Sequence, residues 1–176
     1  MKLILLIAMS VLCLSFFIED KRIKISGYVT GGGELQDSVE VVIFDNNCEV
    51  GQYYTDFEGS FDYELERNKY YTIEYRKSNF FLKRIIIDTG LGENIGSKEF
   101  LVEFSVDLIL VKSLEGVEAD VLDFPVTRFT YDYDSKEFEY ELEFVENRYK
   151  EIQELFDIKK KHDKREEKRS QKKGKK

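Results

Sequence analysis

The chain of 176 residues contains one histidine, His162, which lies in a lysine-rich C-terminal segment. Ser-His-Asp and Cys-His arrangements need a histidine held beside its partners, and catalytic zinc sites usually take histidines on ordered elements. The sequence also has no Gly-x-Gly-x-x-Gly segment after a strand pattern and no Gly-x-x-x-x-Gly-Lys-Ser/Thr loop for phosphate. We therefore expect that the protein is not an enzyme and holds no cofactor or metal.

Carboxylates are the remaining groups with catalytic or ligating chemistry, since the chain has 35 Asp and Glu. A pair of them could hydrolyse a glycosidic bond, but the sequence shows no insertion that would form a sugar cleft. Asp132, Asp134 and Glu137 lie close together in a predicted turn, where calcium would be the matching metal. That segment lacks the glycine and the full ligand set of a calcium loop, so we interpret it as a solvated hairpin turn.

Aromatic side chains offer a second kind of chemistry, because the sequence contains 11 Tyr and 14 Phe. Tyr53-Tyr54 and Tyr70-Tyr71 are adjacent pairs, and a strand places neighbouring side chains on opposite faces. The outward rings could stack on a glycan or a partner protein, or simply cover an edge of a sheet. Cys48 follows a predicted hairpin turn, and we interpret it as a turn or core-edge residue rather than a reactive thiol.

These side chains must be positioned by strands, because residues 21–112 alternate apolar and polar residues with period two. In one example Phe61, Tyr63 and Leu65 point one way while Asp62 and Glu64 point the other. Seven such segments are separated by turns. They predict a mainly β fold, a seven-stranded antiparallel β-sandwich.

The segment Thr55–Phe61 predicts a tight turn with a structural role. We expect Asp56 to cap backbone amides, Gly59 to supply an unusual backbone dihedral, and Phe61 to re-enter the core, with Thr55 opening the motif. The segment looks like the T-D-x-x-G-x-F turn and strand of carboxypeptidase regulatory-like domains. These are transthyretin-like (prealbumin-like) β-sandwiches.

Two further segments resemble the same family. Lys24–Val29 resembles its opening I-x-G-x-V strand, and Leu65–Tyr71 resembles its L-x-x-G-x-x-Y segment, with Asn68 where glycine is usual. The resemblance covers about Arg22 to Asp88, under half of the chain. The remainder is similar to small exported proteins of some gram-negative bacteria. Related modules lie at the N-termini of outer-membrane receptors and beside peptidoglycan-binding domains, so the resemblance implies envelope scaffolding or interaction.

The C-terminal third changes character. Residues 113–140 predict a β extension, and residues 141–176 predict a helix with a lysine-rich tail. Leu142, Val145, Tyr149, Ile152 and Phe156 recur at spacings of three and four, which is one face of a helix. That seam could pair with a partner helix or lie against the sandwich, and the sequence leaves both open.

The tail also reverses the charge of the chain. Residues 159–176 carry eleven Lys and Arg against three Asp and Glu, whereas residues 1–158 carry sixteen basic and thirty-two acidic side chains. Such a tail could bind anionic lipid headgroups. Alternatively, it is a solvated helix end that loosely touches the acidic body.

The N-terminus reads as an export signal. Lys2 precedes an apolar run over residues 3–18, shorter than the roughly 20 residues of a usual spanning helix. Cleavage would remove Cys13 and leave Cys48 without an intramolecular disulfide partner. If the segment is not cleaved, it remains as a membrane anchor. We expect a location in the periplasm or outer envelope, which makes nucleic acid a poor partner.

Together these features predict an exported envelope module that acts as a scaffold or accessory interaction protein, with an unidentified envelope protein as its partner. The alternative is a sandwich that binds a glycan or peptide through exposed tyrosines.

Overall fold

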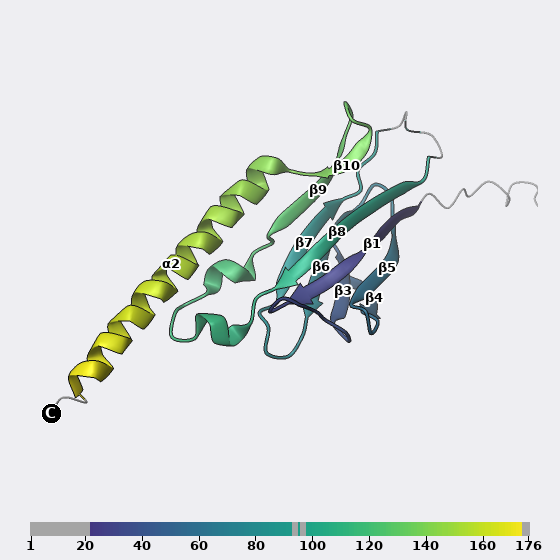
Figure 1. The fold of residues 1–176 in the computed structure, drawn as a ribbon. Coiled ribbons are helices and arrows are strands. Elements are labelled where there is room, and N and C mark those ends of the chain that lie inside the picture. Colours follow the sequence, from purple (N-terminus) through teal and green to yellow (C-terminus); the bar gives the residue numbers. More distant parts are fainter. Residues whose placement is uncertain (1–21, 93–94, 96–97, 174–176) are drawn as a thin grey trace, which may run out of the picture.

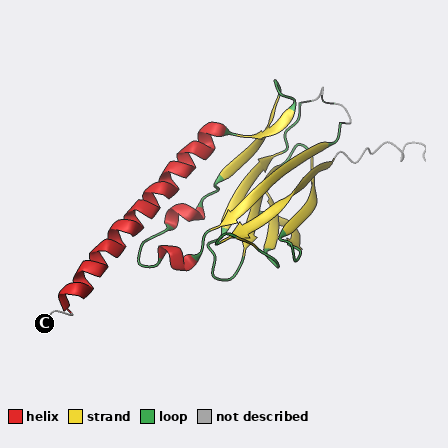
Figure 2. Ribbon diagram, viewed as in Figure 1, coloured by secondary structure: helices red, strands yellow, loops and turns green. Residues whose placement is uncertain are grey.

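The computed structural model describes residues 22–92, 95 and 98–173. This part of the chain contains ten strands in two sheets and one long C-terminal helix (Figures 1 and 2). The mainly β sandwich predicted from the sequence is confirmed. Within 21–112 lie seven strands of six residues or more, together with a strand of two residues. The predicted export signal over 1–18 and the last three residues of the tail lie outside the described residues.

The first sheet is built around its central strand, β1. On one side β1 pairs with β8, and on the other Arg22 to Tyr28 pair with β5 and the last two residues pair with β2. The strands are β1 (Arg22–Gly31), β2 (Glu34–Leu35), β5 (Ser60–Glu66) and β8 (Phe100–Leu108).

The second sheet has six strands in the order β10-β9-β7-β6-β3-β4. Its last two strands, β9 and β10, extend the sandwich beyond β7 through a hairpin. The strands are β3 (Glu40–Asp45), β4 (Cys48–Tyr54), β6 (Tyr70–Arg76), β7 (Lys83–Asp88), β9 (Thr127–Asp132) and β10 (Glu137–Tyr140).

Two strand pairs depart from the antiparallel arrangement that the sequence predicted. The pairs β1–β8 and β7–β9 are parallel. Parallel neighbours need a long crossover connection. Here the chain leaves β7 in the second sheet and crosses to the first sheet, where it forms β8. The chain then returns through residues 109–126 to place β9 beside β7.

The core lies between the two sheets and is filled by the apolar side chains of the alternating pattern. The side chains of Ile25 and Tyr75 are fully buried. The hydroxyls of Tyr63 and Tyr75 lie 3.1 Å apart and form a buried hydrogen bond, and burial raises the pKa of both phenols. Gly27 permits the close approach of β1 and β8, because a Cβ there would lie 1.7 Å from the carbonyl oxygen of Phe104.

Helix α2 (Leu142–Lys173) packs beside the second sheet on a smaller cluster. Leu155 of α2 is buried against Leu114 and Leu122, which come from the short 3-10 segments η1 (Val111–Leu114) and η2 (Asp120–Asp123). The guanidinium of Arg148 donates to the carbonyls of Pro125 and Val121. From Asp163 to Lys172 every residue is exposed, and α2 extends well past the sandwich (Figure 1).

A buried carboxylate links neighbouring strands of the second sheet. Glu74 on β6 is only 8% exposed, and its two oxygens accept from Arg84 Nε at 2.7 Å and Arg76 Nε at 2.9 Å. Burial by itself would raise the pKa of Glu74, but the hydrogen bonds and charges of the two arginines outweigh it and hold the pKa below its ordinary value.

We expect Glu74→Gln to destabilise the protein by about 2 kcal/mol at pH 7, because both arginines lose their anionic partner. Since the folded-state pKa is lowered, the carboxylate stabilises the fold above the unfolded-state pKa of about 4.3, and this contribution disappears as the pH falls through the folded-state value. Urea denaturation of both proteins from pH 7 to pH 3 should show the difference between them shrinking. A difference that does not change with pH would contradict this role of the ionised Glu74.

Candidate functional site

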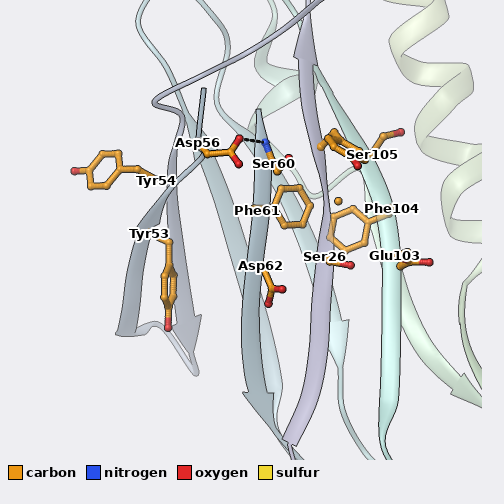
Figure 3. Close-up of a pocket in the computed structure, with 12 residues that line it drawn as sticks. Ser26, Tyr53, Tyr54, Asp56, Ser60, Phe61, Asp62, Glu103, Phe104 and Ser105 are labelled. Carbon is orange, nitrogen blue, oxygen red and sulfur yellow. Dashed lines mark hydrogen bonds between the residues drawn. The ribbon is translucent and has the colours of Figure 1, made fainter. Parts of the chain in front are cut away.

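The turn between β4 and β5 is held by hydrogen bonds within a few residues. Asp56 Oδ1 accepts from the backbone N–H groups of Glu58 at 2.9 Å and Ser60 at 2.8 Å, and the second of these bonds is drawn in Figure 3. Gly59 has φ +74°, a conformation that favours glycine. Thr55 is buried, and its hydroxyl donates to Gln36 O and accepts from Val39 N. The turn therefore leads Phe61 directly into the core.

Beside this turn lies a surface hollow of about 770 Å³, which we call the tyrosine hollow. It is formed by β1, β5 and β8 of the first sheet and by the end of β4, the edge strand of the second sheet (Figure 3). Its lining consists of five aromatic rings, three carboxylates, three serines and one glycine: Tyr28, Tyr53, Tyr54, Phe61, Phe104, Asp56, Asp62, Glu103, Ser26, Ser60, Ser105 and Gly27.

The rings of the tyrosine hollow differ in how firmly they are held. Phe61 and Phe104 pack on each other with centroids 5.4 Å apart, and Tyr53 stacks on the buried Tyr63 at 5.8 Å. Tyr54 is more accessible, being 62% exposed. Its hydroxyl accepts from Gln52 Nε2 at 3.0 Å. The hollow thus combines a packed aromatic wall with exposed rings that a ligand can contact.

The polar groups around these rings are acceptors and hydroxyls. The lining contains Asp56, Asp62 and Glu103 but no Lys, Arg or His. Such a surface suits a ligand that offers N–H or O–H donors. Among the described residues there is no group of three or more His, Cys, Asp or Glu side chains arranged to hold a metal ion.

The acidic segment considered for calcium forms the turn between β9 and β10. Asp132 Oδ1 accepts from the backbone N–H groups of Asp134 at 2.7 Å and Ser135 at 3.0 Å. These bonds lower the pKa of the Asp132 carboxyl. The carboxylate is therefore engaged by its own turn.

Other residues singled out in the sequence are placed apart from the tyrosine hollow. Tyr71 is buried in the core while its neighbour Tyr70 is 41% exposed. Cys48 is an exposed free thiol at the start of β4. His162 lies on α2 beside Gly116, where an added Cβ would come within 2.9 Å of the imidazole.

The residues of the predicted helical seam differ in how far the structure buries them. Leu142 and Tyr149 are 60% and 62% exposed, and Phe156 is 36% exposed. Val145 and Ile152 are half-buried, and Ile152 packs on the cluster that contains Leu155. The sequence interpretation did not single out Leu155, although it lies three residues after Ile152. One edge of the seam therefore contacts the protein's own body, and the other edge is open to solvent.

No family model matches the chain, and no curated protein matches it. Solved structures resemble it over about half its length. A 3-chlorocatechol 1,2-dioxygenase from Rhodococcus opacus is 10% identical with a TM-score of 0.39, covering 51% of this chain and 60% of that protein. A 5-hydroxyisourate hydrolase from Klebsiella pneumoniae is 16% identical with a TM-score of 0.34, covering 48% and 89%.

The major pilin subunit of Bacillus cereus is also similar, at 15% identity and a TM-score of 0.38, covering 50% of this chain and 29% of the pilin. At these identities the likeness concerns the fold alone.

The expectation that this protein is not an enzyme needs correction. It is contradicted by the structures that resemble this chain over about half its length, which include dioxygenases and a hydrolase. The low identity and partial coverage assign no activity to this chain.

We expect Asp56→Ala to destabilise the protein by about 1 kcal/mol, because the N–H groups of Glu58 and Ser60 lose their side-chain acceptor. Asp56→Asn is the matched control, since it keeps an oxygen at Oδ1 and should cost clearly less. Urea denaturation of the three proteins measures the difference. Equal losses for Asn and Ala would contradict the capping role.

Proposed function

We propose that this protein is an exported interaction module of the cell envelope. The sandwich, of the carboxypeptidase regulatory-like kind, serves as a rigid body, and α2 serves as the arm that contacts a partner. The observation that carries this proposal is the shape and charge of α2. It is anchored on the body through Leu155 and Arg148, yet its exposed last part extends away from the sandwich (Figure 1).

The charge of the last part of the arm, residues 159–173, supports a role in contacting a partner. Residues 159–173 carry nine Lys and Arg against three Asp and Glu, while the chain as a whole has a net charge of −8. Only some of these charges are paired within the helix, as in the ion pairs Lys159–Asp163 and Arg169–Glu166. The remaining cations can attract an acidic protein surface or anionic lipid headgroups.

The location in the envelope is supported by the sequence of residues 1–18, with Lys2 before an apolar run. Among the described residues, no helix combines the length and apolar character needed to cross a membrane. It is Lys2 and the apolar run after it that support the periplasm or outer envelope as the proposed site of action.

We expect the arm to be required for capture of an envelope component. Crosslinked complexes recovered from native envelopes should contain a partner in near-stoichiometric amount with the full chain. A chain stopped after Ile158 should recover it about 10-fold less well, because the cationic arm that attracts the partner is gone.

A full-length control separates charge from helix length: Lys164, Arg165, Lys168 and Arg169 are replaced by glutamine, which retains helix propensity. If both variants recover less of the partner than the wild type does, the result supports a contact made by the charges of the arm. Equal recovery from all three proteins, or no partner for any of them, would contradict the proposed function.

The tyrosine hollow supports a second candidate function, the binding of a glycan or peptide. The observation that favours it is the exposed ring of Tyr54 beside the carboxylates and serines of the lining. Exposed aromatic rings next to acceptor groups can stack on a ligand and accept its hydrogen bonds.

We expect Tyr54→Ala to weaken such binding about 10-fold, because the most accessible ring of the hollow is lost. Isothermal titration with a chitin oligosaccharide and, separately, with a lysine-containing tetrapeptide measures this. Tyr140→Ala is the matched control, since Tyr140 is an exposed tyrosine on β10, outside the hollow. An equal effect of both changes, or no binding of either probe, would contradict the role of the hollow.

A further inference from the structure

The last turns of α2 gather positive charge on one side of the helix. Five cations follow one another at spacings of three, one, three and four residues, which a helix places within about 100° of each other around its axis. We call them the cationic flank: Lys161, Lys164, Arg165, Lys168 and Lys172. All five are exposed, and none of them forms an ion pair within the part of the chain that the structure describes.

The acidic side chains of the same segment lie elsewhere around the helix. Asp163, Glu166 and Glu167 are each at least about 110° from the middle of the cationic flank. Asp163 is paired with Lys159, and Glu166 is paired with Arg169. A helix with its side chains is about 10–12 Å across, and charges are screened over about 8 Å at physiological salt. These carboxylates therefore weaken only slightly the attraction of an anionic surface to the cationic flank.

The cationic flank also faces away from the sandwich. Helix α2 is anchored on the body through Arg148, Ile152 and Leu155. Their mean direction is roughly 150° around the helix axis from the cationic flank, and the end of α2 extends past the sandwich (Figure 1). A large surface can therefore approach the flank without meeting the body.

The residue types of this segment favour a membrane over an acidic protein. Residues 159–173 contain no apolar side chain, whereas protein interfaces are centred on apolar, aromatic or arginine anchors and are depleted in lysine. Four of the five cations of the flank are lysines, which lack the planar fork by which arginine grips one fixed carboxylate or phosphate. A row of lysines suits a surface on which many anionic groups move sideways.

We propose that the cationic flank binds the surface of a bilayer that contains anionic lipids, with the last three turns of α2 lying along that surface. The inference rests on the proposed function, which locates the protein in the cell envelope and makes α2 its contact arm. The flank is about 16 Å long and engages several headgroups at once. Because no apolar side chain enters the hydrocarbon, the contact is reversible and is weakened by salt.

The test is flotation of the full-length protein with vesicles of phosphatidylglycerol and phosphatidylcholine in a ratio of about 3:7, and with vesicles of phosphatidylcholine alone. The wild type is expected to bind the anionic vesicles at least about 30-fold more tightly at about 50 mM NaCl, and to be released at about 500 mM NaCl. Replacing Lys161, Lys164, Lys168 and Lys172 together by glutamine is expected to weaken binding to the anionic vesicles about 100-fold, because each lysine near such a surface contributes several-fold.

The matched control removes the same charge elsewhere. Lys24, Lys112, Lys136 and Lys150 are exposed lysines outside the flank, and replacing them together by glutamine gives a chain of the same net charge. This variant is expected to change binding by less than about 3-fold. Any contribution of the apolar run over residues 3–18 is common to all three proteins and is measured with the neutral vesicles. Circular dichroism verifies that both variants fold.

Four results overturn the proposal. The first is equal binding to the two kinds of vesicle, or no binding to either. The second is equal weakening by the two variants, which would mean that net charge matters rather than the flank. The third is tighter binding to a DNA duplex than to the anionic vesicles at the same salt, which would assign the flank to nucleic acid. The fourth is release by inorganic phosphate but not by chloride at equal ionic strength, which would indicate a discrete phosphate site.

This experiment separates the bilayer contact from the proposed function. If anionic vesicles are not bound but the arm still recovers a partner from native envelopes, this inference fails and the proposed function stands, with a protein as the contact of the arm. If the vesicles are bound through the flank but native envelopes yield no partner, the proposed function fails and the bilayer contact stands.

Discussion

The structure depends most on the close approach of β1 and β8 at Gly27. There the backbone of β8 comes so near that any Cβ on residue 27 would overlap the carbonyl oxygen of Phe104. This contact lets β1 serve as the central strand of the first sheet, with β8 on one side and β5 on the other. The absence of a side chain at Gly27 also leaves room for the ring of Phe61, which packs against the partly buried ring of Phe104. The same two rings line the tyrosine hollow. The close approach at Gly27 therefore affects both the packing of the core and the shape of the candidate site.

The tyrosine hollow shows how local and distant contacts combine. The turn at Asp56 is closed by hydrogen bonds to residues two and four positions away. Its direction, however, is set by Thr55, whose hydroxyl bonds to Gln36 and Val39 in the segment that leads into the neighbouring strand β3. The turn is therefore held both by bonds within it and by bonds to a distant segment. Because it is held in both ways, the exposed Tyr54 just before it has a defined position beside the first sheet. A binding surface on such a turn is preorganised, which lowers the entropy cost of holding a ligand.

The helix and the sandwich are joined by a limited contact. A small apolar cluster around Leu155 and the carbonyl contacts of Arg148 anchor α2, and the aromatic ring of Phe144 lies 4.8 Å from the guanidinium of Arg128. A helix of 32 residues has more surface than this cluster covers. The uncovered surface is apolar on one flank and cationic at its end, and neither feature contributes to the fold of the body. Both are therefore available for contacts between molecules.

The sequence by itself determined the features that arise between near neighbours. Alternation predicted the strands, the Thr55–Phe61 motif predicted its turn, spacings of three and four predicted the helix, and counting predicted the charge reversal at residue 159. These are local properties, because backbone conformation responds to residues within about one turn or one hairpin.

Only the tertiary structure decided which strands pair and which helical face is covered. The parallel pairing of β1 with β8 places Ile23 opposite Phe100, which is far away in the sequence. The alternation of apolar and polar residues does not predict this pairing. Likewise, the spacing of the seam did not reveal that Leu155 would be buried and Tyr149 exposed. That choice depends on η1 and η2, which fold against α2 from a separate part of the sequence. Long-range packing selects one arrangement among many that the local pattern allows, because each has the same alternation but buries a different surface.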